Sequence, residues 1–301
     1  MKPFFFLLTI AFFISFQVTI AQTTSPLSEL KGHSVKILYS KDHEPRARSI
    51  AERVNKAMSY FEDLLSFKPQ VTLLVLNEAD WKIHTTVPMI YGMPHYTNEK
   101  VLIVAAEDND FWRSFLPLTA QLPNHLKEPI QKTYTNKNGT ISMQPFFDLL
   151  ALHELGHAFH MQAGLNMQRK WMGELFSNML LHTYVAEKEK ETLSALTLFP
   201  QMVINGGTQN YKYTSLQDLE ANYSEIGMQH PNNYGWYQSR WHAAAARIYD
   251  EGGVTVVQKL WKALQKEKET FEDAALITLL ESEVHKSMAD FIRNWDAETR
   301  K

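Results

Sequence analysis

The stretch from Pro145 to Gly164 constrains this chain more than any other. It holds His153 and His157, four residues apart, with Glu154 between them, and so reads H-E-x-x-H. Proline is typical of the first turn of a helix and glycine of its end. Residues four apart on a helix lie one above the other, about 5.4 Å along the axis. The spacing therefore predicts a helix that presents both imidazoles on one face.

Two imidazoles so placed reach one zinc ion at ~2.0–2.1 Å. Glu154 lies one step round the helix, where a carboxylate faces a metal-bound water and serves as a general base. Apolar residues surround this helix on all sides, which predicts burial. A buried glutamate beside two histidines is costly without a metal or other partners. The alternative is a pair of core histidines hydrogen-bonded to their neighbours.

A catalytic zinc ion needs a third protein ligand and keeps its fourth position for water. The chain has no cysteine, so histidine and carboxylate are the only plausible ligands. Glu174 lies on a second helical stretch, from Lys170 to about Lys190, after a short connection. A helix–turn–helix arrangement brings it back beside the first helix, which makes Glu174 the candidate.

Trp171 and Glu174 form a W-x-x-E pattern after H-E-x-x-H. In this the chain resembles the gluzincin metallopeptidases, such as thermolysin and aminopeptidase N. It is most similar to the peptidase MA-like family of secreted bacterial proteins. The resemblance covers about residues 91–295 and is strongest at 150–178 and 234–261.

The resemblance implies a zincin-like fold and one Zn²⁺ per chain, held by His153, His157 and Glu174, with Glu154 as the general base. One position departs from the pattern. Four residues after the ligand glutamate, where an aspartate usually orients a ligand histidine, the chain has Asn178. An amide oxygen accepts a hydrogen bond from an imidazole N–H but gives less charge assistance.

The N-terminal part predicts a small mixed sheet with helices, which makes the fold class α+β. Residues 33–40 and 71–76 have strand patterns and flank an amphipathic helix at 42–67, so a parallel crossover is expected. Another strand is expected at 101–105. Residues 22–32 are polar and predict a loose lead-in.

A glycine and two prolines at 87–98 fit an edge strand or a loop. In gluzincins the matching region is the edge strand that pairs with the substrate backbone. The resemblance therefore implies that Gly92, Met93 and Tyr96 bind substrate, while an ordinary loop is the alternative. His95 is interpreted as a loop residue rather than a ligand.

The remainder of the chain predicts helices. Residues 106–144 contain three prolines and predict an irregular segment before the H-E-x-x-H helix, with residues 108–110 as cap candidates for a short helix through Leu116. Ser215 is a cap candidate for a short helix. A long helix at 232–253 and three amphipathic helices then follow, at 254–267, 270–281 and 287–295. We expect an N-terminal α/β subdomain at 22–165 and a helical subdomain at 166–301.

Tyr237, near the start of the long helix, matches the MA-like position whose tyrosine donates a hydrogen bond to the oxyanion formed during hydrolysis. The resemblance thus makes Tyr237 a catalytic candidate, with Tyr234 as the alternative. His242 is a candidate for a related role. The competing interpretation is a packing tyrosine on an aromatic-rich helix.

Residues 1–21 resemble a secretory signal peptide, with Lys2, a short apolar stretch and a small-x-small site at 19–21. We therefore expect a secreted or periplasmic protein; an uncleaved anchor is the alternative. After cleavage no stable membrane span is expected. The net charge of −3 gives no basic excess to suggest a nucleic-acid partner.

The sequence thus predicts a secreted zinc metallopeptidase that acts on peptides or proteins. One rival is a zinc hydrolase with a non-peptide substrate. The other is a non-catalytic secreted binding protein whose metal site serves stability. A structural site of that kind is closed by a fourth protein ligand, for which His160 and His182 are the nearby candidates. The oligomeric state and the choice between endo- and aminopeptidase stay open.

Overall fold

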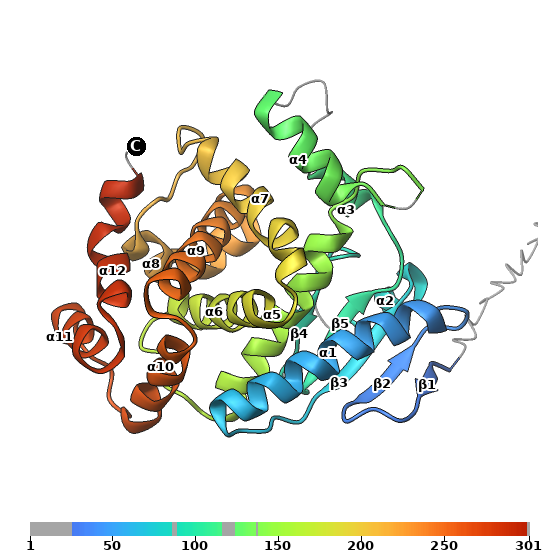
Figure 1. The fold of residues 1–301 in the computed structure, drawn as a ribbon, viewed down its shortest axis with the longest axis horizontal. Helices are drawn as coiled ribbons and strands as arrows, with labels where there is room; N and C mark the ends of the chain where they lie inside the picture. The colour runs from blue at the N-terminus through green and yellow to red at the C-terminus, as the bar shows by residue number, and fades with distance from the viewer. Residues whose placement is uncertain (1–25, 86–88, 116–123, 137, 300–301) are drawn as a thin grey trace, which may run out of the picture.

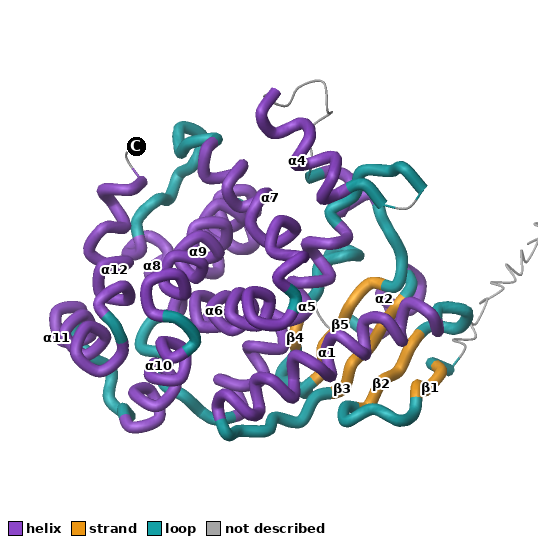
Figure 2. The backbone as a smooth tube through the Cα atoms, in the orientation of Figure 1, coloured by secondary structure: helices purple, strands orange, loops and turns teal. Residues whose placement is uncertain are grey.

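A computed structural model describes residues 26–85, 89–115, 124–136 and 138–299. The predicted signal peptide at 1–21 lies outside these ranges. A small sheet occupies one side of the molecule and helices fill the other (Figures 1 and 2). The coarse prediction of an α+β fold with a small mixed sheet is confirmed.

The sheet has five strands, in the order β1-β2-β3-β5-β4. The three central strands are parallel, and the two edge strands are antiparallel to their neighbours. The bounds are β1 Ser28–Leu30, β2 Lys36–Tyr39, β3 Thr72–Leu76, β4 His95–Tyr96 and β5 Val101–Ala105. The predicted parallel crossover is confirmed. The loose lead-in expected at 22–32 is wrong at 28–30, because the short strand β1 pairs with β2 there.

Two long helices pack on the sheet. Helix α1 (Glu44–Leu65) contacts β2 and β3, and α5 (Gln144–Gln162) contacts β5 and β4. Their apolar faces meet, with the rings of Phe61 and Phe159 5.6 Å apart. Helix α5 thus lies between the sheet and the helical side of the molecule (Figure 1).

The other helices are named by the bounds α2 Glu78–His84, α3 Asp110–Ser114, α4 Asn124–Tyr134, α6 Lys170–Lys188, α7 Leu193–Asn205, α8 Leu216–Gln229, α9 Pro231–Gly252, α10 Thr255–Lys266, α11 Asp273–Leu279 and α12 Lys286–Thr299. Ser215 caps α8 through a reciprocal pair of bonds with Asp218. The hydrophobic core continues from the sheet through α5 and α6 into α9. No helix among the described residues is both long and apolar enough to cross a membrane.

The short helix expected after residues 108–110 forms as α3, with Asn109 as its cap, but the irregular segment expected at 106–144 is wrong at 124–134, where α4 forms. Helix α4 tolerates Pro129 in its interior. Proline has no backbone N–H, and Pro129 lies beyond the first four residues of α4, whose N–H groups have no partner within a helix. Pro129 therefore costs α4 one bond, while Ile130 and Tyr134 hold the helix against the core.

Candidate metal centre

Helix α5 carries the H-E-x-x-H residues in its middle and is buried on nearly every side. Pro145 lies in its first turn, and Gly164, just beyond its end, has a φ of +63° that favours glycine. His153 is almost fully buried and His157 partly so. The helix therefore holds both imidazoles inside the molecule, at its boundary with the helical side.

Three potential ligand atoms converge there. Nε2 of His153 lies 3.1 Å from Nε2 of His157 and 3.2 Å from Oε2 of Glu174, and the third separation, His157 to Glu174, is 3.6 Å. A tetrahedral site with bonds of ~2.0–2.1 Å has edges of about 3.3–3.4 Å. The triangle of donors has this size, and two imidazoles with one carboxylate are a ligand set typical of catalytic zinc. These residues fit a zinc ion.

Close packing of α6 on α5 brings Glu174 to the imidazoles. A Cβ atom at Gly156 would lie 2.9 Å from the Cα of Ser177, so the two backbones meet closely at this point. Trp171, at the start of α6, is buried and fixes that end of the helix in the core. Glu174 lies one turn from Ser177, on the side that faces the histidines.

Glu154 lies beside this triangle. Its ligand atom and those of His153 and His157 are all within 4.8 Å of one another. Its Oε2 also accepts a hydrogen bond from the backbone N–H of Tyr96, at 3.1 Å. Because Tyr96 belongs to edge strand β4, the sheet fixes this carboxylate through a backbone group. Glu174 thus contacts both imidazoles, whereas Glu154 is held by the sheet beside them.

The two imidazoles have uncharged acceptors behind them. With a metal ion at Nε2 of each imidazole, Nδ1 would carry the hydrogen and donate it. His153 Nδ1 lies 3.0 Å from Oδ1 of Asn178, and His157 Nδ1 lies 2.9 Å from Nε2 of His160. Burial, followed by the nearby charge of His157, lowers the pKa of His160 to about 3, which keeps it a neutral acceptor.

Electrostatics inside the metal-free cluster favour an ion pair. Burial by itself lowers the pKa of His157, but the Glu174 carboxylate outweighs it and, with Glu154, raises that pKa to about 9. Burial likewise raises the pKa of Glu174, and the imidazoles of His157 and His153 outweigh it and hold that pKa well below its usual range. In the metal-free protein the raised pKa therefore favours the protonated form of His157 at neutral pH.

Residues of α8 and α9 complete the surroundings of Glu174. The hydroxyl of Tyr223 donates to Oε1 at 2.7 Å, and Nε2 of Gln238 donates to Oε2, also at 2.7 Å. The hydroxyl of Tyr234 lies 3.2 Å from that of Tyr223 and accepts from Gln238 at 3.0 Å. Sequence reasoning missed Tyr223 and Gln238. Only the spacing of Tyr234 and Gln238, one helical turn apart, hinted that they share a face.

Tyr237, the tyrosine expected from the resemblance, does not contact the cluster. Its hydroxyl donates to the carbonyl of Ser215 at 2.7 Å, and its ring stacks on Trp295. The offset from Tyr234 is three residues, which turns the side chain about 60° away from the face that Tyr234 and Gln238 share. Tyr234, the alternative, is the tyrosine of α9 that reaches the cluster.

Of the three residues expected to bind substrate, Tyr96 contacts Glu154, whereas Gly92 and Met93 have other partners. Tyr96 lies on the edge strand and touches Glu154 through its N–H. Gly92 has a φ of +104°, and its carbonyl accepts from the indole of Trp112, so it faces α3. Met93 closes a turn, its N–H donating to Ile90 at 3.1 Å. Gly92 and Met93 therefore shape the approach to β4 without contacting the cluster.

Four other histidines lie outside the triangle. His160 lies behind His157, and His182 packs against the ring of Tyr249 at 5.5 Å. His95 packs on Trp81. His242 is buried, with its ring 6.4 Å from that of His153. Burial, with the charges of His153 and His182, holds the pKa of His242 well below its usual range.

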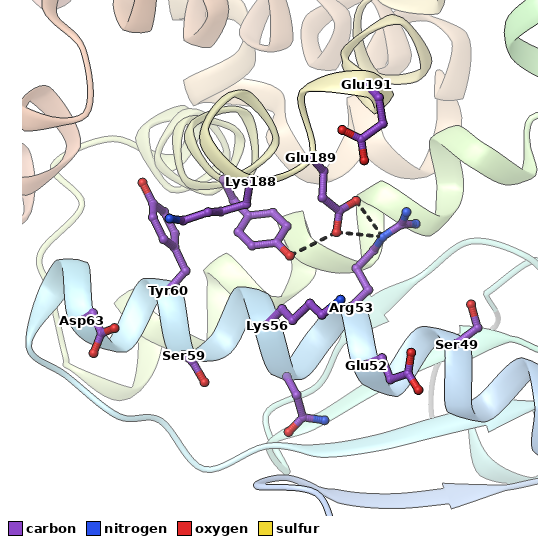
Figure 3. A pocket seen from close by; sticks show the side chains of 12 residues that line it. Ser49, Glu52, Arg53, Lys56, Ser59, Tyr60, Asp63, Lys188, Glu189 and Glu191 are labelled. Carbon is purple, nitrogen blue, oxygen red and sulfur yellow. Dashed lines mark hydrogen bonds and ion pairs between the residues drawn. The ribbon is translucent and has the colours of Figure 1, made fainter.

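Two large hollows lie away from this cluster, with volumes of about 860 and 1270 Å³. The first is a groove between α1 and the end of α6 (Figure 3). There Arg53 pairs with Glu189 at 3.0 Å, and Glu189 also accepts from Tyr184. Three basic and four acidic side chains line this groove, so it has little net charge. Donor geometry, and not the size of a hollow, therefore marks the candidate site.

Comparison with models of protein families finds no match for this chain, and comparison with curated proteins finds no relative.

Proposed function

We propose that the chain is an exported zinc metallopeptidase of the gluzincin type, with a zincin-like fold. One observation carries the proposal: Nε2 of His153, Nε2 of His157 and Oε2 of Glu174 converge at 3.1–3.6 Å, beside the carboxylate of Glu154. The resemblance of residues 150–178 to gluzincins supports it. Residues 1–21 support export.

In this proposal zinc supplies a Lewis acid that polarises the substrate carbonyl and acidifies a water molecule. Glu154 accepts a proton from the attacking water and delivers it to the leaving amine nitrogen. The N–H of Tyr96 holds one oxygen of Glu154, which leaves the other oxygen for the water.

Tyr234 takes the role of oxyanion donor, in place of Tyr237. Burial, with the charge of Glu174, raises the pKa of Tyr234 well above its usual range, so the hydroxyl keeps its proton. Tyr223 donates to Glu174, so the Tyr234 hydroxyl donates to Tyr223 in the metal-free protein. Turned instead to the developing oxyanion, it would contribute a few kcal/mol of transition-state stabilisation.

A peptide substrate is favoured by the position of β4. This strand is at the edge of the sheet, next to Glu154, and an extended chain adds to such an edge through backbone hydrogen bonds.

The test is cleavage of a peptide library by the zinc-loaded protein, read by mass spectrometry, with Glu154→Gln alongside. We expect the parent to cleave and the variant to bind one zinc ion per chain with a rate at least ~10²-fold lower, because only the general base is lost. Loss of zinc from the variant would show that Glu154 is a ligand. A zinc-loaded parent that cleaves no peptide would reject the peptidase in favour of a non-peptide hydrolase or a metal-stabilised binding protein.

A further inference from the structure

We infer that Asn178 and Gln238 act as one unit, a directed chain of amide hydrogen bonds that positions two of the zinc ligands at once. The inference rests on the zinc site proposed above. Oδ1 of Asn178 lies 3.0 Å from Nδ1 of His153, Nδ2 of Asn178 donates to Oε1 of Gln238 at 3.3 Å, and Nε2 of Gln238 donates to Oε2 of Glu174 at 2.7 Å. This series of hydrogen bonds, called the amide relay below, starts at His153 and ends at Glu174.

The direction of the chain is fixed at its first bond. With Nε2 of His153 facing the cluster, its Nδ1 is the donor and Asn178 must present its oxygen. The NH₂ group of Asn178 then faces Gln238, which must accept through its own oxygen. This leaves the NH₂ group of Gln238 for Glu174. Each amide has one orientation that satisfies its partners.

Both amides are held by their surroundings. Asn178 is fully buried on α6, so its bonds have no competition from water. Gln238, on α9, uses its second hydrogen on the hydroxyl of Tyr234 at 3.0 Å. Tyr234 in turn contacts Tyr223, which donates to the other oxygen of Glu174. The chain therefore ties α6 and α9 to the orientation of a single carboxylate.

A carboxylate at position 178 conflicts with this arrangement. An aspartate has no hydrogen for Oε1 of Gln238, so two acceptors would face each other about 3.3 Å apart. If the Gln238 amide turned over to donate to the aspartate, its oxygen would face Oε2 of Glu174 instead. The asparagine is thus required by Gln238, and its effect on the metal depends on which residue stands at 238.

A double-mutant cycle on zinc affinity tests this dependence. The zinc dissociation constant is measured by competition with a chelating dye for the parent, Asn178→Asp, Gln238→Met and the double variant. Partners behind metal ligands typically contribute ~10–100-fold in affinity. We expect Gln238→Met to weaken zinc binding by ~10-fold or more. We expect Asn178→Asp to weaken binding in the parent and to strengthen it in the Gln238→Met background, where its charge assists His153 without opposition.

The relay is supported when the effect of Asn178→Asp differs by ~10-fold or more between the two backgrounds. It is overturned when the effect is equal in both. Gln258→Met is the matched control, because Gln258 donates to the carbonyl of Leu64 on α1 and has no contact with the cluster; its zinc affinity should equal that of the parent. Gln238→Leu replaces Gln238→Met in the cycle if the latter does not fold.

The cycle separates this inference from the proposed function. A parent that binds no zinc rejects the metal site and the relay together. Zinc binding and peptide cleavage with equal effects in both backgrounds reject the relay alone. Zinc binding and a coupled cycle without hydrolysis of any peptide leave the relay standing and reject the peptidase.

Discussion

Nδ1 of His157 and Nε2 of His160 lie 2.9 Å apart, yet the surroundings of the two imidazoles favour a protonated His157 and a neutral His160. His157 faces the Glu174 carboxylate, which overcomes burial and raises its pKa to about 9. For His160, burial is the largest influence and, with the charge of His157, lowers its pKa to about 3. One imidazole therefore holds a proton that a metal ion must displace, while the other remains a neutral acceptor behind it.

This difference predicts a pH dependence of stability that zinc reverses. In the metal-free protein the pKa of His157 is about 9, above the ordinary 6.5 of the unfolded chain. Its contribution, on the order of 3 kcal/mol, is fully present below about pH 6.5 and is lost as the pH rises through 9. Urea unfolding with a chelator should show this loss in the parent relative to His157→Gln.

With zinc bound, His157 must be neutral when folded, so its contribution should instead rise as the pH passes 6.5. The same unfolding series in saturating zinc provides the comparison. If the stability of the metal-free protein stays flat or rises between pH 6.5 and 9, then the charge of Glu174 does not raise the pKa of His157 in the folded state.

For single residues, the sequence predicts those side-chain positions that depend on one helix alone. The spacing of His153 and His157 is enough to place both imidazoles on one face of α5. Tyr223 and Gln238 belong to other helices, and their contact with Glu174 depends on how α8 and α9 pack. On α9, the tyrosine that lies near the cluster is Tyr234, which contacts Tyr223 and Gln238, and not Tyr237.

At the scale of elements, the contact between α5 and α6 decides whether a site exists. Gly156 lies against the backbone of Ser177, where a Cβ atom would come within 2.9 Å of a Cα atom. Backbone cannot give way as a flexible side chain can. Because Gly156 has no side chain, α5 and α6 pack at this short separation, and Glu174 lies close enough to contact the imidazoles.

We predict that Gly156→Ala separates the helices and weakens zinc binding together with stability. Overpacking of this kind typically costs about 1–3 kcal/mol. Thermal unfolding of the metal-free protein and a zinc titration measure the two effects. Gly227→Ala is the control: Gly227 is exposed on α8 with no atom within 4 Å of an added Cβ, and alanine there should stabilise by about 0.5–1 kcal/mol. A Gly156→Ala protein with parental zinc affinity would show that α6 adjusts without moving Glu174.

Elements with a sustained apolar period were predictable, and short ones were not. Helices α1, α5 and α9 agree with their predicted ranges within about two residues, as is usual for helix ends. Strand β1 has three residues, too few for a pattern, and exists because β2 offers an edge. Helix α4 forms despite an internal proline, because tertiary packing outweighs a local propensity.

At the scale of the whole molecule, the ion pair of Arg46 and Asp148 joins α1 and the end of β5 to the helix of the candidate site. Arg46 of α1 donates through Nη1 to Asp148 of α5 at 2.7 Å, and its other terminal nitrogen lies 3.4 Å from the carbonyl of Ala105 at the end of β5. Both side chains are mostly buried. A helix, a strand and the helix of the candidate site therefore meet at one guanidinium group.

We predict that Arg46→Met destabilises the protein by about 3–5 kcal/mol, because it leaves the Asp148 carboxylate buried without its partner. The double variant Arg46→Met/Asp148→Leu should recover most of that loss. Urea unfolding measures both. Arg48→Met is the control, since Arg48 is half exposed and pairs with Glu44 within α1, and should change stability by less than about 0.5 kcal/mol. A single variant as destabilised as the double one would show that packing, and not charge, accounts for the effect.

The bond from Tyr96 N–H to Glu154 has a consequence for how such a protein can diversify. The donor is a backbone group, so every residue type except proline can provide it. An alanine scan of the edge strand would leave the anchor of the proposed base in place while changing the surface that meets a ligand. Ligand preference and the hold on the base are therefore separable traits at position 96, and the side chain there can be exchanged without loss of that hold.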